Sequence, residues 1–253
     1  MGAGRPRRVM RIALDHSTEV GMRTGKLLLG EAKLETLGIV GQPVSDRDPR
    51  LRRIDDLEGF DVVVTDDPEL GIARQAIESG VPIVAWVDGD DVAPEDPAVP
   101  LMTGANLATG IALALAAREI ASVGHPSSAL VAWTEPGTPV RSGEPVTFPD
   151  PVGARWGRIR HRHGISTEVV VPLAGEWAGV VVRVSDEQRT RILGIADLAT
   201  HLEAVALTAG TVTIASGTAR PGLVRPADYA DEYLLAALRI GLDIASFTSA
   251  TTP

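Results

Sequence analysis

The sequence predicts an α/β protein, in which a doubly wound parallel sheet is followed by a smaller α+β domain with an open mixed sheet. The first observation behind this prediction is the alternation of apolar, β-branched runs with helix-forming segments between residues 9 and 122. The second is a series of strand-like segments after residue 128 with no helical sequence between them. The third is apolar helical sequence after residue 186. We therefore expect two domains, covering residues 1–124 and 125–253.

In the first half, strand-like runs are separated by polar loops and helix-forming sequence. Strands are predicted at 9–14, 36–40, 60–65 and 81–87. Helices are predicted at 20–29, at 68–80 up to the terminating Gly80, and within 101–122 after an asparagine loop. Strands joined by helices at this spacing pair in parallel through right-handed crossovers. Their carboxyl ends then border one crevice, which is where open α/β sheets bind ligands.

Proline- and glycine-containing turns separate the strands expected in the second half. These strands are predicted at 129–133, 145–148, 165–171 and 177–184. Consecutive strands without helices between them indicate an antiparallel or mixed sheet. Helices are predicted at 186–208 and 226–246. The second of these helices carries an apolar stripe of Leu234, Leu235, Leu238, Ile240, Leu242 and Ile244.

Composition excludes several classes of protein. The chain has 253 residues, 44% of them apolar and 23% charged, which is typical of a globular protein with a buried core. A net charge of −9 argues against nucleic-acid binding, because phosphate contacts need a basic surface. Without cysteine, disulfides and thiolate zinc sites are excluded, and the cytoplasm is the expected compartment. The sequence contains no membrane segment and no motif of serine hydrolases, P-loop nucleotidases or zinc proteases.

The loop 15–21 joins the first strand to the first helix and is the first candidate ligand site. In alternating α/β proteins, a dinucleotide pyrophosphate lies against the unpaired amides at this helix N-terminus. His16, Ser17, Thr18, Gly21 and Met22 are therefore the candidate cofactor contacts. A dinucleotide turn has three glycines, and alignment on Gly21 leaves His16 and Thr18 where the G-x-G-x-x-G form needs glycine. Side chains there should hinder close approach of a pyrophosphate.

Charged residues near the expected crevice have more than one interpretation. The second strand ends in Gly41 and Gln42, where a dinucleotide site commonly has an acid for the ribose hydroxyls. An arginine cluster follows, which either meets the 2′-phosphate of NADP or is simply solvated; it consists of Arg47, Arg50, Arg52 and Arg53. The crevice loops carry Asp15, Glu19, Asp66, Asp67, Asp88, Asp90 and Asp91. These acids oppose a pyrophosphate. One interpretation is an oxygen-ligand site for Mg²⁺ or Ca²⁺, but the acids lack the spacing of an ion-binding loop, so we expect solvated loop carboxylates and no metal site.

Four stretches resemble dihydrodipicolinate reductase in order and spacing. They are the loop 15–21, Val64-Thr65-Asp66-Asp67-Pro68, Trp86-Val87-Asp88-Gly89 and Ala105-Asn106-Leu107-Ala108-Thr109-Gly110. The resemblance implies a Rossmann-like dinucleotide-binding domain at 1–124 and an α+β substrate and oligomerisation domain at 125–253, with the C-terminal helix packed back on the first domain. It also implies NAD or NADP as cofactor, with Asp66, Trp86, Asp88 and Asn106 at the nicotinamide end. A homo-oligomer, dimer or tetramer, is expected.

The segment 155–163 is the one dense basic patch in this acidic chain. Arg158, Arg160 and Arg162 are candidates for binding a carboxylated or phosphorylated substrate, and His161 and His163 are weak catalytic candidates as general acids. The alternative is an exposed edge strand with the three arginines on one face and the histidines on the other. The histidine and lysine motif of the reductase family is missing from its expected place, where Thr134-Glu135-Pro136-Gly137-Thr138-Pro139 stands instead.

Two functions follow from these patterns. The first is an NAD(P)-dependent oxidoreductase that acts on a small carboxylated or amino-acid-like molecule. The second is a non-catalytic relative, a homo-oligomeric binding or scaffold protein that kept the sheet and lost the glycines. The side chains at His16 and Thr18 favour the second function, because each adds a Cβ where the backbone should approach a pyrophosphate.

Overall fold

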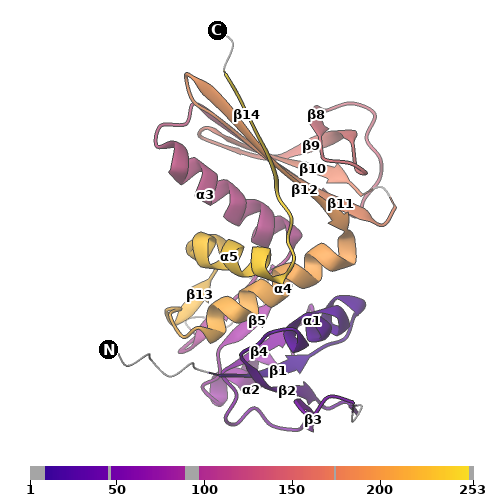
Figure 1. The fold of residues 1–253 in the computed structure, drawn as a ribbon, viewed down its shortest axis with the longest axis vertical. Coiled ribbons are helices and arrows are strands. Elements are labelled where there is room, and N and C mark those ends of the chain that lie inside the picture. Colours follow the sequence, from indigo (N-terminus) through magenta and orange to yellow (C-terminus); the bar gives the residue numbers. More distant parts are fainter. Residues whose placement is uncertain (1–8, 45–46, 89–96, 174, 251–253) are drawn as a thin grey trace.

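The computed structural model describes residues 9–44, 47–88, 97–173 and 175–250. These residues form two seven-stranded sheets, with helices α3, α4 and α5 lying between the sheets (Figure 1). The helices run over Glu19–Leu29 (α1), Ala73–Glu78 (α2), Leu113–Val123 (α3), Ala199–Ala215 (α4) and Ala230–Ile240 (α5). A π-helical turn, η1 (Leu107–Ala112), precedes α3, and a short 3₁₀ turn, η2 (Pro226–Tyr229), precedes α5.

The first sheet is parallel throughout and doubly wound. Its strands are β1 (Met10–Asp15), β2 (Leu34–Val40), β3 (Leu51–Ile54), β4 (Val62–Thr65), β5 (Ile83–Ala85), β6 (Pro100–Met102) and β13 (Gly222–Val224). The strand order is β13-β6-β5-β4-β1-β2-β3. The chain therefore changes direction across the sheet between β1 and β4, and a ligand crevice is expected outside their carboxyl ends.

Helices cover both faces of this sheet because successive side chains of each strand point to opposite faces. Ile12 and Val62 belong to the core that contains Leu28 of α1 and Leu207 of α4. Val63 belongs to a separate core on the other face, together with side chains of α2. The buried, β-branched strands that the sequence predicts are thus sandwiched between helical layers.

The second sheet is mixed, as predicted. Its strands are β7 (Ser128–Glu135), β8 (Glu144–Thr147), β9 (Ala154–His163), β10 (Ser166–Pro172), β11 (Trp177–Ser185), β12 (Arg189–Leu198) and β14 (Ala245–Ala250). The order is β14-β12-β11-β7-β10-β9-β8, in which β7 and β10 pair in parallel and the other neighbours are antiparallel. Trp133 and Val180 pack in the core that holds α3 and α4, whereas Val169 and Val181 pack with Phe148 in a separate core.

The helix predicted at 186–208 is wrong over its first half. Residues 189–198 form strand β12, and the helix α4 begins only at Ala199. β12 pairs with β11 from Thr190↔Ser185 to Leu198↔Trp177, and with β14 on its other side. The ladders with the preceding strand β11 and the distant strand β14, together with the burial of Leu193 and Ile195, favour a strand here, and a local helical pattern does not register this pairing.

Two other predicted helices are shorter than expected. Of 226–246, only Ala230–Ile240 is α-helical, because Gly241 leaves the helical conformation at φ 133°, and residues 245–250 form β14. Of 68–80, only Ala73–Glu78 is helical, although Gly80 does end it at φ 67°. Strands β3 and β13 were not predicted from the sequence.

The second half of the chain contributes to both sheets. β13 pairs with β6 of the first sheet, so sheet membership does not follow the predicted boundary at residue 124. Helix α4 packs against α1, β4 and β5, whereas the C-terminal helix α5 packs chiefly on α3 and α4. Helix α4 thus lies against the parallel sheet, while α5 contacts the predicted first domain through α3 and through an ion pair between Arg239 and Glu31 at 3.2 Å.

Among the helices of the described residues, none has the combined length and apolar character needed to cross a lipid bilayer.

Candidate functional site

The first turn of α1 is closed by a carboxylate from another loop. Thr18 is the N-cap, and its Oγ1 accepts a hydrogen bond from the amide of Val20 at 3.1 Å. The amides of Ser17, Thr18 and Gly21 donate to the two oxygens of Asp66 at 2.6, 2.9 and 2.8 Å. The hydroxyls of Ser17 and Thr18 donate to the same carboxylate at 3.2 and 2.5 Å. Five donors therefore converge on one side chain.

Asp66 lies at the change of direction in the parallel sheet. It follows β4, which is hydrogen-bonded to β1, and its side chain is fully buried. Burial by itself raises the pKa of this carboxyl, but the Thr18 hydroxyl and the amides of Ser17, Thr18 and Gly21 outweigh burial and hold the pKa below 3.8. Asp66 is therefore an anion at neutral pH, and it occupies the position where the sequence predicts a pyrophosphate. Asp66 is not among the residues that line the pocket containing Trp86 and Asn106.

Gly21 is needed because the backbone and Asp66 approach each other closely. A Cβ at this position would lie 2.5 Å from Oδ2 of Asp66 and 2.5 Å from the Cβ of His16. His16 does not cap the helix; its carbonyl accepts a hydrogen bond from Nε2 of Gln42 at 2.8 Å. Met22 is exposed on α1. Of the five residues predicted for the turn, Ser17, Thr18 and Gly21 thus carry the anion contacts.

The acids of the crevice have separate local roles. Oδ2 of Asp15 accepts a hydrogen bond from Oγ1 of Thr65 at 2.9 Å, while Asp67 accepts the amides of Glu69 and Gly71 at 3.1 and 2.8 Å. Burial raises the pKa of Asp15, Thr65 opposes the shift, and the charges of Asp67 and Asp66 add to it. Asp88 is paired with Arg225.

Within the described residues, no group of three acids or histidines has metal-binding geometry. The predicted crevice acids Asp90 and Asp91 lie outside the described residues.

The arginine cluster is tied to partners close to it. Arg50 bridges Asp48 at 2.8 Å and the carbonyl of Leu29 at 2.8 Å, and Arg53 pairs with Asp55 at 3.1 Å. The guanidinium of Arg52 lies over the Phe60 ring, 5.5 Å from its centroid. Arg47 precedes this group, which lies on and beside the unpredicted strand β3. These contacts favour the interpretation of the cluster as a structural surface feature.

A pocket of about 330 Å³ lies between the two sheets. It is lined by Val20 of α1, by Trp86 after β5, by Asn106 and Leu107 at η1, by Thr134, Glu135 and Pro136 at the end of β7, and by Ala199, Thr200 and Glu203 of α4, among others. Trp86 and Asn106 were predicted at the nicotinamide end. Asn106 is the N-cap of η1, since its Oδ1 accepts the amide of Thr109 at 2.9 Å, and its Nδ2 donates to the Trp86 carbonyl at 3.0 Å.

Glu203 is a pocket residue that sequence reasoning missed. Its Oε2 accepts hydrogen bonds from Nε1 of Trp86 at 2.8 Å and from the amide of Leu107 at 2.9 Å. Burial raises the pKa of Glu203, these two donors oppose the shift, and the negative charge of Glu135 adds to it. The available signal was that Glu203 is the one acid in the apolar stretch 202–215, a position where a charge is costly unless it has a partner or a purpose.

The predicted basic patch lies on β9, where Arg158, Arg162, His161 and His163 are exposed and the two histidine rings are stacked 6.1 Å apart. The pairing shifts so that Ile159 faces Val169 and His161 faces Glu168. The regular alternation proposed for this strand is therefore interrupted at Arg160. Arg160 lies over the Trp133 ring and contacts Oε1 of Glu135 at 3.3 Å, so it meets the pocket rim.

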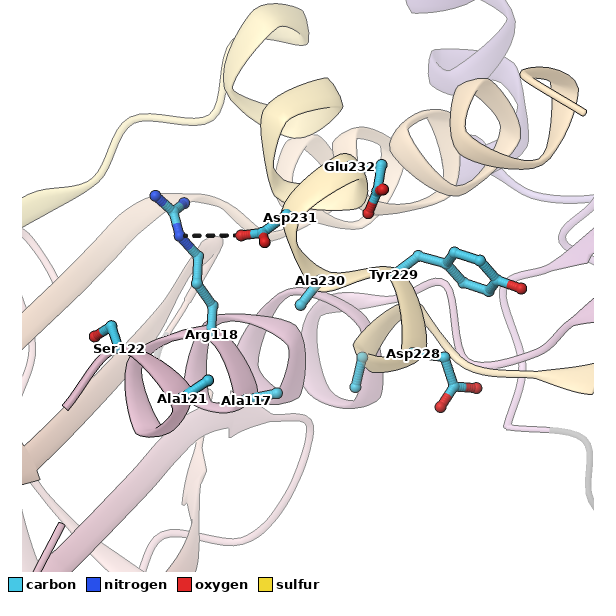
Figure 2. Close-up of a pocket in the computed structure, with 10 residues that line it drawn as sticks. Ala117, Arg118, Ala121, Ser122, Asp228, Tyr229, Ala230, Asp231 and Glu232 are labelled. Atoms are coloured by element: carbon cyan, nitrogen blue, oxygen red, sulfur yellow. Dashed lines mark ion pairs between the residues drawn. The ribbon is translucent and has the colours of Figure 1, made fainter. Parts of the chain in front are cut away.

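A second hollow, of about 540 Å³, lies between α3 and the start of α5. Figure 2 shows that short alanine side chains and acids line it, with Arg118 paired to Asp231 at 3.6 Å. Its lining residues come from α3, η2 and α5 and include none of the loops at the strand ends. The smaller pocket between the sheets is therefore the better candidate site, since ligands of open α/β sheets bind at the strand ends.

No protein-family model matches the sequence, and no curated protein sequence matches it. Solved structures do match in fold. Dihydrodipicolinate reductase from Paenisporosarcina sp. TG-14, with dipicolinate bound, has 11% identity over 86% of this chain and 97% of that chain, with a TM-score of 0.54. Homospermidine synthase from Legionella pneumophila, in complex with NAD, has 8% identity over 95% of this chain and 91% of that chain, with a TM-score of 0.56.

A third similar structure is the DAP dehydrogenase of C. glutamicum in complex with DAP. It has 10% identity over 88% of this chain and 95% of that chain, with a TM-score of 0.52. Similarity at this level of identity concerns the fold. The Rossmann-like sheet and the second mixed sheet of the dihydrodipicolinate reductase-like fold, which the sequence predicts, are confirmed.

Proposed function

We propose that this chain is an NAD(P)-dependent oxidoreductase that acts on a small carboxylated or amino-acid-like molecule. One observation carries the proposal. The pocket between the sheets joins Val20 of the first helix, Trp86 and Asn106 at the strand ends, and Glu135 of the second sheet. In this fold, that is the place where a cofactor on the first sheet meets a substrate on the second. The similar structures, among them one in complex with NAD, support the same class of reaction.

The donors at the first turn suit the pyrophosphate of a dinucleotide. Three amides and two hydroxyls converge on one point, and Gly21 has no Cβ to obstruct it. The Asp66 carboxylate occupies this anion-binding position in the structure. Ser17, Thr18 and Gly21 would thus hold the pyrophosphate, with Trp86 and Asn106 towards the nicotinamide. When bound, NAD or NADP would donate or accept a hydride.

Glu203 is the proposed proton donor of the pocket. Its Oε2 is engaged by Trp86 and Leu107, so Oε1 is the atom proposed to carry the proton. Burial raises its pKa, which keeps the acid protonated to higher pH than in an exposed glutamate. At the rim, the ion pair of Arg160 with Glu135 offers both signs of charge. Such a pair complements the carboxylate and ammonium groups of an amino-acid-like molecule.

The second candidate is a non-catalytic binding protein, a homo-oligomer assembled through its second sheet. The contact that favours it is the carboxylate of Asp66, which already satisfies the amides that a pyrophosphate would need. The exposed side chains of Trp156, Ile159 and Phe247 on that sheet support an association surface.

Calorimetric titration with NADH and with NADPH tests the proposed function. The first proposal expects saturable binding of at least one dinucleotide, which Gly21→Asp abolishes by placing a second carboxylate in the turn. Hydride transfer is then followed with small keto and imino acids, where Glu203→Gln should lower kcat more than it changes KM. If neither dinucleotide binds at millimolar concentration to the natural chain or to a variant without the Asp66 carboxylate, the non-catalytic candidate replaces the oxidoreductase.

A further inference from the structure

We propose that Asp66 is a tethered competitor for the pyrophosphate position, so that an external anion binds at the first turn of α1 only when this side chain leaves it. In naming the dinucleotide as that anion, the inference rests on the proposed function. The competition itself rests on contacts within the chain.

The contacts of Asp66 leave no shared place for a second anion. Oδ1 accepts the Ser17 amide, and Oδ2 accepts the amides of Thr18 and Gly21. The two hydroxyls of the turn also point to this carboxylate. A phosphate oxygen bound to the same amides would have to lie where the carboxylate oxygens lie, and two anions in van der Waals contact repel each other strongly in a buried site.

Tethering makes Asp66 an effective competitor. The side chain is attached to the end of β4, which is paired to β1 beside the turn, so its local concentration at the amides is high and constant. An external anion binds only the fraction of molecules in which the turn is vacant, and its apparent affinity falls by that fraction. When the Asp66 carboxylate is bound to the turn amides, it therefore inhibits the binding of external anions at this site.

The neighbours of Asp66 indicate that the side chain, and not the whole loop, is the part that moves. Thr65 holds Asp15 through its hydroxyl and also accepts the Asp67 amide at 3.0 Å. Asp67 in turn binds the amide of Gly71 at 2.8 Å. These contacts fix the loop on both sides of Asp66 without using its side chain. Removal of the carboxylate should thus vacate the turn and leave the loop in place.

The test compares Asp66→Ala with the natural chain and with Glu69→Ala. Glu69 is an exposed acid three positions further along the same loop, so its loss removes the same charge without changing the turn. Binding of inorganic pyrophosphate, NADH and NADPH is measured by calorimetry on all three proteins at one pH and low salt. We expect Asp66→Ala to bind pyrophosphate about tenfold or more tightly than the natural chain, equivalent to about 1.4 kcal/mol, and Glu69→Ala to change affinity less than about threefold.

The outcomes separate this inference from the proposed function. Tighter binding of pyrophosphate and of a dinucleotide to Asp66→Ala supports both. Tighter binding of pyrophosphate alone supports the competitor and contradicts the dinucleotide. Equal or weaker binding of pyrophosphate to Asp66→Ala overturns the competitor, as does an equal gain in Glu69→Ala. Should Asp66→Ala fail to fold, Asp66→Asn, which keeps an acceptor oxygen and loses the charge, is read by the same criteria.

Discussion

The surroundings of two carboxyl groups in this protein shift their pKa values in opposite directions. Asp66 accepts three amides and two hydroxyls, so its pKa lies below the ordinary value in spite of burial. Glu203 has two donors on a single oxygen and a negative neighbour in Glu135, so burial prevails and its pKa is raised. The same functional group therefore has a lowered pKa at one end of the crevice and a raised pKa in the pocket.

Gly21→Ala should destabilise the fold by about 1–3 kcal/mol, because the added methyl group meets the Asp66 carboxylate and the His16 side chain. The helix propensity of alanine acts in the other direction and is smaller, at about 1 kcal/mol. Urea unfolding followed by circular dichroism measures the change. Met22→Ala, on the exposed face of the same helix, is the control and should stay within about 0.5 kcal/mol. Equal stability of Gly21→Ala and the natural chain would contradict the close contact.

Glu203→Gln should change the dependence of stability on pH. The folded pKa of Glu203 is raised above 4.5, so its favourable contribution is complete below the unfolded pKa and is lost as pH rises through the folded value. The natural chain should therefore lose stability relative to Glu203→Gln as pH increases upward from about 4.5. Thermal unfolding across this range measures the difference. Parallel curves for the two proteins would contradict the raised pKa of Glu203.

At the scale of elements, α5 is held to α4 and η1 by one buried tyrosine. The hydroxyl of Tyr233 donates to the Ala206 carbonyl at 3.1 Å, and the side chain is fully buried. A Cβ on Gly110 would lie 2.6 Å from this hydroxyl, so η1 passes directly over it. Gly110 thus permits the close approach of three helical segments.

Tyr233→Phe should cost about 0.5–1.5 kcal/mol, since the ring packing is kept and only the hydrogen bond to Ala206 is removed. The matched control is Tyr229→Phe. Its hydroxyl accepts the amide of Arg220 at 3.0 Å in an exposed setting, where water can replace it. Chemical unfolding of the two variants gives both values. A loss in Tyr229→Phe as large as that in Tyr233→Phe would contradict the assigned role of burial.

At the scale of the molecule, α4 is shared between two cores. Leu202 and Val205 pack in the core under the second sheet, whereas Leu207 and Ile214 pack in the core of the parallel sheet. β13 adds a second link, because it follows α4 and returns to the parallel sheet. If α4 detached from one sheet, the cores of both sheets would be exposed to water. The two sheets should therefore unfold together.

Unfolding should therefore be a single transition by near-UV and far-UV circular dichroism. Val205→Ala and Leu207→Ala remove side chains from different cores, and each should lower the midpoint of the same transition. Leu207→Ala should reduce the free energy of unfolding by about 2–5 kcal/mol. Two resolved transitions, each sensitive to one of the variants, would show that the sheets are independent.

The sequence by itself determined the doubly wound sheet, the mixed second sheet and the glycine-poor first turn. Strands such as β4, with four consecutive buried residues, are specified by neighbours a few positions away. Trp86 and Asn106 were named as candidates through the resemblance to the reductase family and not through local pattern. Strand β12 was missed because it is stabilised by a ladder with the preceding strand β11 on one side and with the distant strand β14 on the other, and this pairing decided against a helix.

Only the tertiary structure decided the chemistry of the site. Asp66 and Ser17 are 49 positions apart, and Glu203 and Trp86 are 117 positions apart. The sequence contains both acids, but it does not show the amides that lower the pKa of Asp66 or the burial that raises the pKa of Glu203. Charge state depends on the donors and the burial that folding brings together, and those are properties of three-dimensional proximity, which local patterns do not contain.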